Sequence, residues 1–158
     1  MNDSMVQYMK EAIRLARINV EQLHGGPFGC VIVKDGKIIA AAHNEVLTSK
    51  DPTAHAEIVA IRSACQAIGS HQLTGCEIYA SCEPCPMCLG AIYWSRPDKV
   101  YYAASRVDAA NAGFDDAFIY SEMCNHPGDR AIPFVQFMQK EVQQLLHEWS
   151  ENNHIPGY

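Results

Sequence analysis

The chain has 158 residues, 48% of them hydrophobic, and a formal net charge of −6. This length and composition suit one domain with a core of its own, so we expect a single domain over residues 1–158. Its lysine and arginine residues are scattered, whereas tight binding to a phosphate backbone requires a basic stripe. We therefore expect a small neutral substrate and no nucleic acid.

The cellular location is predicted from features that the sequence lacks. Its start, Met1-Asn2-Asp3-Ser4, has no basic region of an export signal, and no apolar run is long enough to span a bilayer. The 7 cysteines are an odd number, which favours a reducing compartment with metal or core roles for the thiols. We expect a cytoplasmic protein with no membrane partner.

The first half of the chain predicts a helix followed by a hairpin. Apolar residues recur at helical spacing from Ser4 to Leu23, with Asp3 or Ser4 as the cap. Two apolar runs, Cys30 to Lys34 and Lys37 to Ala42, flank the turn signal Asp35-Gly36. Because apolar residues are consecutive in both runs, we expect both strands to be buried on both faces.

Helices and strands alternate in the rest of the chain. We expect helices from Asp51 or Pro52 to Ile68, Pro84 to Ser95, Asp115 to Met123 and Lys140 to Trp149, and strands at Glu77 to Ser81, Val100 to Ala104 and Phe134 to Met138. This order predicts an α/β fold of three layers, α-β-α. Its central mixed sheet would have about five strands, with helices on both faces.

Two clusters in the middle of the chain carry the chemistry: His55-Ala56-Glu57, and Cys85 with Cys88 in Glu83-Pro84-Cys85-Pro86-Met87-Cys88. One imidazole and two thiolates suit zinc, and three protein ligands leave the fourth tetrahedral position for water. A nearby carboxylate that is not a ligand, here Glu57, can move protons between that water and a substrate. We predict one zinc ion per chain.

Both clusters are expected where helices begin. If His55 and Cys85 lie in the first turns of their helices, amide groups and the helix dipole favour negative charge beside them and lower the cysteine pKa. The position of Glu57 does not follow from spacing, because residues two apart on a regular helix point about 200° away from each other around the axis.

The two clusters form H-x-E followed by P-C-x-x-C, the signature of zinc-dependent nucleobase deaminases. Together with Gly26-Pro27-Phe28-Gly29, Ser81 to Cys88, Ala91-Ile92-Tyr93-Trp94 and Ala112 to Asp116, the chain resembles bacterial guanine deaminases of the cytidine/deoxycytidylate deaminase superfamily. The resemblance implies the cytidine-deaminase-like fold and zinc-dependent hydrolysis of guanine to xanthine and ammonia. It also implies a homodimer in which residues 152–158 form a tail exchanged between subunits.

The resemblance implies a role for each matching residue. Glu57 takes a proton from the activated water, delivers it to ring N3 as the water attacks C2, and assists the departing amine. Asp116, the second catalytic residue, accepts a hydrogen bond from the purine. The expected substrate-binding residues are Asn44, Phe28, Ala56, Phe114, Trp94 and Tyr158, and Tyr158 would complete the partner's site. For Phe28 and Trp94, packing in the core explains the residue equally well.

Other interpretations remain open at this stage. Within the superfamily they are a tRNA adenosine deaminase or a cytosine or cytidine deaminase. Ala112 to Asp116, the final Tyr158 and an acidic last helix favour guanine. A structural zinc module with Cys82 as fourth ligand is the alternative that is not an enzyme. C-x-x-C-x-x-C from Cys82 to Cys88 also begins an iron–sulfur pattern, which leaves the first cluster unexplained.

Overall fold

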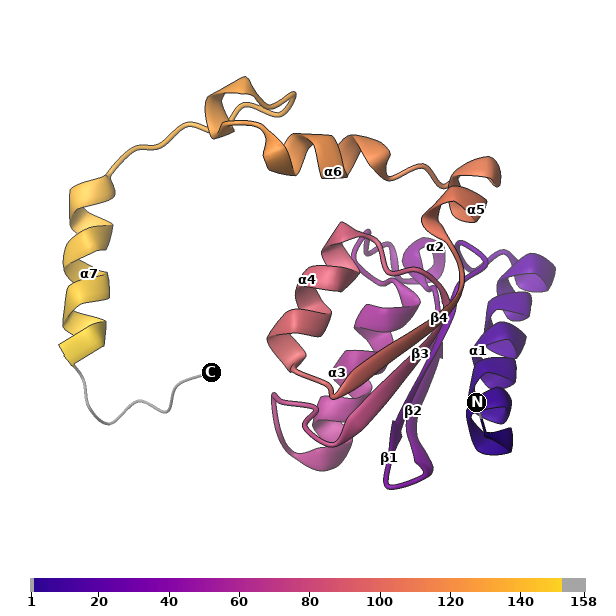
Figure 1. Ribbon diagram of the computed structural model, residues 1–158. Helices are drawn as coiled ribbons and strands as arrows, with labels where there is room; N and C mark the ends of the chain where they lie inside the picture. The colour runs from indigo at the N-terminus through magenta and orange to yellow at the C-terminus, as the bar shows by residue number, and fades with distance from the viewer. Residues whose placement is uncertain (1, 152–158) are drawn as a thin grey trace. The chain divides into compact units, whose positions relative to one another are not determined.

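The computed structural model describes residues 2–151 and consists of two compact units, with the boundary in the sequence after Asp116. The first unit contains a four-stranded sheet in the order β2-β1-β3-β4 (Figure 1). Its strands are β1 (Gly29–Lys34), β2 (Lys37–His43), β3 (Cys76–Cys82) and β4 (Lys99–Ala104). β1 pairs antiparallel with β2 and β3, and β3 pairs parallel with β4. The predicted mixed sheet is confirmed.

Helices cover both faces of this sheet, as expected for three layers. α1 (Asp3–Gln22) lies on one face, and α3 (Ala56–Ile68) and α4 (Pro86–Ser95) lie on the other (Figure 1). Alternate residues of β1 serve the two layers: Val31 and Val33 pack in the cluster with α1, whereas Cys30 and Ile32 pack in the cluster with α3. This alternation is the ordinary pleat of a strand buried on both faces.

Burial on both faces was also expected for β2, and that expectation was wrong. Ile38 is 44% exposed and Ala41 is exposed. The reason is position, because β2 is an edge strand and part of it is not covered by a helix layer. The hairpin turn between the two strands is as predicted, since Asp35 and Gly36 both have positive φ, at 49° and 73°.

The helix ends differ from the sequence expectation by small but informative amounts. The cap of α1 is Asn2, whose Oδ1 accepts a hydrogen bond from the Met5 backbone N–H at 3.0 Å, in place of the expected Asp3 or Ser4. α1 ends at Leu23 in the left-handed conformation, before the glycines. Two short helices were not expected at all: α2 (Val46–Ser49) and α5 (Arg106–Asn111).

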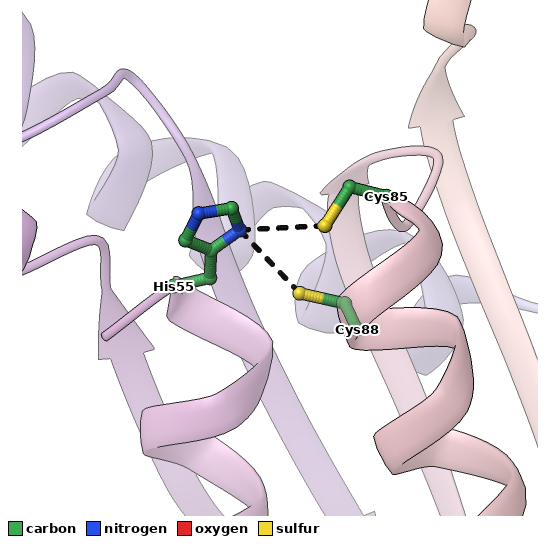
Figure 2. A group of neighbouring side chains, drawn as sticks. All are labelled: His55, Cys85 and Cys88. Atoms are coloured by element: carbon green, nitrogen blue, oxygen red, sulfur yellow. Dashed lines mark hydrogen bonds between the residues drawn. The ribbon is translucent and has the colours of Figure 1, made fainter. Parts of the chain in front are cut away.

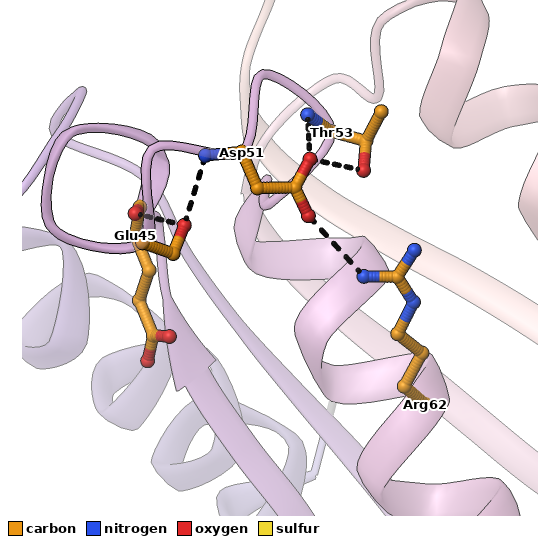
Figure 3. A network of polar contacts seen from close by, with 5 residues as sticks. Glu45, Asp51, Thr53 and Arg62 are labelled. Atoms are coloured by element: carbon orange, nitrogen blue, oxygen red, sulfur yellow. Dashed lines mark hydrogen bonds and ion pairs between the residues drawn. The ribbon is translucent and has the colours of Figure 1, made fainter.

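The largest difference concerns the start of α3, which was expected at Asp51 or Pro52 and lies at Ala56. Asp51 organises a turn instead of a helix (Figure 3). Its Oδ1 accepts hydrogen bonds from the Thr53 backbone N–H at 2.8 Å and the Thr53 hydroxyl at 2.7 Å. Its Oδ2 lies 3.7 Å from the Arg62 guanidinium on α3. The turn therefore holds the chain just before the helix and sets the position of His55.

The second unit, described for residues 117–151, contains α6 (Ala117–Cys124), a 3-10 helix η1 (Pro127–Asp129) and α7 (Gln139–Glu151). The fifth strand expected at Phe134 to Met138 is not formed: this segment is irregular, and Val135 is 81% exposed. A strand needs a neighbouring edge to pair with, and the described part of this unit offers none. Across residues 2–151, no helix is long and apolar enough to cross a membrane.

Candidate active site

The two predicted ligand clusters meet at the N-terminal ends of α3 and α4. His55 and Cys85 are the residues just before these helices, both with extended backbones, at φ −68° and ψ 154° for His55 and φ −64° and ψ 168° for Cys85. The expectation that they lie within the first turn was wrong by one residue. The correction removes the geometric objection to Glu57, because the extended backbone at His55 breaks the helical relation between the two side chains.

The three predicted metal ligands point at one another (Figure 2). The His55 Nδ1 atom lies 3.5 Å from the Cys85 Sγ and 3.5 Å from the Cys88 Sγ, and all three ligand atoms lie within 4.8 Å of one another. A tetrahedral zinc with Zn–S of about 2.3 Å and Zn–N of about 2.0 Å separates its nitrogen and sulfur ligands by about 3.5 Å. The donor set and its spacing therefore fit zinc.

A hydrogen bond between the two thiols changes the pKa of each. A hydrogen bond from Cys88 lowers the pKa of Cys85 to about 4, with help from His55 and against the opposing effect of burial. The same contact, together with burial, raises the pKa of Cys88. One thiolate is thus present at neutral pH, and the second thiol loses its proton when a divalent metal binds.

Cys82, the expected fourth ligand of a structural zinc, is engaged elsewhere. Its Sγ lies 3.6 Å from the backbone carbonyl oxygen of Ser105. Within residues 2–151, the group of side chains that could bind a metal ion contains only His55, Cys85 and Cys88. The neighbouring Glu83 ties the same loop to the start of α5, since its Oε2 accepts a hydrogen bond from the Arg106 backbone N–H at 3.0 Å. The described residues therefore leave a tetrahedral metal one position for water.

Glu57 lies beside the ligands without joining them. Its side chain is only 7% exposed, and burial raises the pKa of its carboxyl group. A raised pKa makes a carboxylate a better proton acceptor, as a general base requires. The sequence interpretation required a carboxylate near the ligands that is not itself a ligand, and the position of Glu57 is compatible with that role.

A cavity of about 530 Å³ lies beside the three predicted metal ligands. Five of the predicted site residues line it together with two of the ligands: Phe28, Asn44, Glu57, Phe114 and Asp116, with His55 and Cys85. The Phe28 and Phe114 rings meet edge to face, with centroids 5.0 Å apart. The cavity thus combines a buried carboxyl group, other polar groups and an aromatic wall, as binding sites for flat heterocycles commonly do.

Asn44 lies on the cavity wall with its amide held in one orientation. It is 4% exposed, and its Oδ1 accepts a hydrogen bond from the Val46 backbone N–H at 3.1 Å, which fixes the amide. The side chain lines the cavity, and in the described part of the chain no hydrogen bond engages its Nδ2 group. A fixed amide with a free donor at a cavity wall suits recognition of a base edge.

Asp116 lines the same cavity, and partial burial together with the negative charge of Cys85 raises the pKa of its carboxyl group. The remaining charged residues that line the cavity, Glu83, Arg106 and Asp115, were not among the sequence candidates. Glu83 and Asp115 lie within the recognised motifs, so their place in those motifs was a usable signal. No pattern in the sequence pointed to Arg106.

Three predicted substrate residues receive no support from this geometry. Ala56 is fully buried and Trp94 is 66% exposed at the end of α4, and neither is among the lining residues of the cavity. Tyr158 lies outside the described residues. The roles of all three stay predictions.

The three-ligand site makes a testable statement about metal content. Elemental analysis of the purified protein should find one zinc per chain. Cys82→Ser should keep it, because the Cys82 thiol is hydrogen-bonded to the Ser105 carbonyl and is not one of the three predicted ligands. The exposed Cys124 provides the matched control, Cys124→Ser. Loss of zinc in Cys82→Ser alone would point to a four-ligand structural site, and iron with sulfide would contradict the assignment altogether.

Comparison with known proteins agrees with this site. The family model for the cytidine and deoxycytidylate deaminase zinc-binding region matches residues 3–104. The guanine deaminase of Bacillus subtilis (strain 168) is 56% identical over 142 residues, which cover 90% of this chain and 91% of the relative. A tRNA-specific adenosine deaminase of Aquifex aeolicus (strain VF5) is 38% identical over 144 residues, covering 90% of this chain and 91% of that relative.

A solved structure extends the likeness to three dimensions. The X-ray structure of guanine deaminase from Bacillus subtilis matches with a TM-score of 0.93 and 52% sequence identity, covering 100% of this chain and 99% of the other. The matched region contains His55, Cys85 and Cys88. The chain belongs to the zinc-binding cytidine and deoxycytidylate deaminase family.

Proposed function

We propose that the protein is a zinc-dependent guanine deaminase, which hydrolyses guanine to xanthine and ammonia in purine catabolism or salvage. The observation that carries the proposal is one cavity that joins the ligand cluster to Glu57, Asn44 and Asp116. The likeness to Bacillus subtilis guanine deaminase, at 56% identity, supports guanine as the substrate.

The residues around the cavity divide the work of binding. In the proposed complex the purine lies over the ring of His55, against the wall of Phe28 and Phe114, which both line the cavity. Asn44 donates from its Nδ2 group to the purine edge and so orients the base. Asp116 accepts a hydrogen bond from the ring amide or the exocyclic amine, which brings C2 towards the ligand cluster.

Proton movement is assigned to Glu57. When bound, zinc supplies the Lewis acidity that activates a water molecule for attack at neutral pH. Glu57 takes a proton from that water and delivers it to ring N3 as the oxygen bonds to C2. The carboxyl group then takes the remaining proton from the oxygen on C2 and delivers it to the departing amine. The bond between C2 and the amine nitrogen breaks, and ammonia leaves. Its burial keeps these transfers away from bulk water.

The chain is proposed to act as a single deaminase domain in a homodimer, with residues 152–158 exchanged so that Tyr158 completes the partner's site. The resemblance of the chain end to the tail of guanine deaminases supports this. The preceding α7 gives further support, because it presents an apolar stripe whose members are all more than half exposed: Val142, Leu145, Leu146 and Trp149. Such a stripe needs a surface to cover it.

A tRNA adenosine deaminase is the second candidate, because the relative from Aquifex aeolicus covers the chain as fully as the first. Its identity is lower, at 38% against 56%. The net charge of −6 also suits a neutral base better than a polyanion. The position of Cys82 disfavours a purely structural zinc module.

A substrate panel with ammonia detection tests the assignment. Guanine should be turned over, whereas cytidine and adenine should be poor substrates or inert, because Asn44 and Asp116 would be matched to the guanine edge. An anticodon stem-loop of tRNA, assayed for conversion of adenosine to inosine, is the discriminating substrate. Efficient turnover of that RNA without turnover of guanine would favour the second candidate.

A further inference from the structure

Asn19 connects two walls of the cavity from behind. It lies in the last turn of α1, is 2% exposed and does not line the cavity itself. Its Nδ2 group donates hydrogen bonds to the backbone carbonyls of Gly26 and Asn44, each at 2.7 Å. Because both partners are carbonyls and can only accept, the orientation of this amide is unambiguous. One side chain thus joins segments that are 18 residues apart in the sequence.

Both segments that Asn19 joins belong to the cavity lining. Gly26 and Asn44 line it directly, and Phe28 lies between them in the hydrogen-bond pattern. The Phe28 N–H donates to the Gly26 carbonyl at 2.8 Å, and the Asn44 N–H donates to the Phe28 carbonyl at 3.0 Å. The two hydrogen bonds from Asn19 link the first and last residues of this chain of hydrogen bonds, Gly26 and Asn44. They therefore hold the aromatic wall and the Asn44 amide at a fixed distance.

The packing around these segments leaves little room for movement. A Cβ atom on Gly25 would overlap the Asn44 amide, and one on Gly26 would lie 2.8 Å from the Phe28 ring and 3.1 Å from the Phe114 ring. A small shift of the glycine segment would therefore displace both Asn44 and the aromatic wall. The position of the segment controls the shape of the cavity.

Among the described residues, only the Nδ2 end of the Asn19 amide makes hydrogen bonds. Its buried Oδ1 has no hydrogen-bond partner within the described residues. An unpartnered buried acceptor is unfavourable, and an apolar side chain of the same size would avoid it. What an apolar side chain cannot provide is the pair of donors to the two carbonyls.

We propose that Asn19 is a positioning residue for purine recognition, which fixes the distance between the Phe28 wall and the Asn44 amide. The inference rests on the proposed function for the identity of the ligand. It assigns Asn19 no contact with the substrate, the metal ligands or the proton carrier. Its loss should affect binding of the base more than the chemical step.

Asn19→Asp is the sharpest variant, because it keeps the size of the side chain and replaces the two donors by acceptors facing two carbonyls. We expect KM for guanine to rise about tenfold, with kcat changed by less than about threefold and the zinc content unchanged. Hydrogen exchange should become faster at the Phe28 and Asn44 amides, and remain unchanged at Ile32 and Ile78 in the core.

Two controls on the same helix separate positioning from general stability. Leu15→Ala removes packing between α1 and the sheet, and Tyr8→Phe removes a donor to the Gly36 carbonyl at the other end of the helix. Both should lower the melting temperature and leave KM unchanged. If Asn19→Asp behaves like them, with unchanged KM and unchanged exchange at Phe28 and Asn44, the proposal is wrong.

The remaining outcomes are also decisive. Should Asn19→Asp not fold, Asn19→Ser replaces it, and the same comparison of KM and exchange applies. Failure of both variants to fold would assign Asn19 to the fold and overturn its role in recognition. A wild-type protein inert towards guanine would contradict the proposed function alone, because the exchange measurement needs no substrate and still tests the connection made by Asn19.

Discussion

Glu57→Gln should lower the rate of guanine deamination at least about a hundredfold while zinc stays bound at one ion per chain. The amide keeps the shape of the side chain but cannot accept and deliver the proton. The three ligand atoms are untouched, because they belong to His55, Cys85 and Cys88. Turnover by ammonia release and zinc by elemental analysis, measured on the same preparation, give the two quantities.

The matched control is Glu83→Gln, a second carboxylate on the wall of the same cavity. Glu83 accepts a hydrogen bond from the Arg106 backbone N–H, and a glutamine Oε1 can accept it too, so this variant should keep most of its activity. Loss of zinc together with activity in Glu57→Gln would identify Glu57 as a ligand or a structural residue. Equal losses in both variants would remove the special role of Glu57.

Deleting Asn153 to Tyr158 should abolish most turnover and leave folding and zinc content intact. Residues at a chain end are ordinarily dispensable, because few of their backbone groups are buried. A large loss of activity is expected here because Tyr158 is proposed to supply a wall and a polar group of the cavity. Tyr158→Phe is the milder change for comparison. It keeps the aromatic ring that forms the wall and removes only the hydroxyl group, so it should retain more activity than the deletion.

Mixing variants tests whether the tail is exchanged. The tail-deleted chain is combined with the Glu57→Gln chain under conditions in which dimers dissociate and reform. In an exchanged heterodimer one site joins an intact Glu57 to a tail from the other chain, so activity should return. If each tail serves its own subunit, every site stays defective. Full activity of the tail-deleted chain alone would remove both Tyr158 and the exchanged dimer from the account.

The parts of the fold that were predicted correctly depend on local chemistry. Asp35-Gly36 forms the expected turn because these residues adopt positive φ readily, and β1 is buried on both faces as its unbroken apolar run indicated. The zinc ligands could likewise be predicted from the sequence. Their residue types specify the metal, so His55, Cys85 and Cys88 could be named before their distances were known.

The errors arose where distant parts of the chain decide the outcome. Asp51 had the sequence of a helix cap, yet its carboxylate holds Thr53 and Arg62 in a turn, and the helix begins later. Phe134 to Met138 had the composition of a strand, but residues 117–151 of the second unit contain no strand for it to pair with. Asn19 gave no signal, because it acts on backbone carbonyls, which every residue has.

The predicted metal ligands and much of the cavity wall occupy different kinds of structure. His55, Glu57, Cys85 and Cys88 sit at or within helix starts backed by the central sheet. Much of the cavity wall comes from connections between elements: Gly25, Gly26, Phe28 and Asn44, and the segment after α5. Loops tolerate substitution and insertion better than packed helices do. A change in these connections can therefore alter the shape of the cavity while the helix ends that carry the metal ligands stay in place.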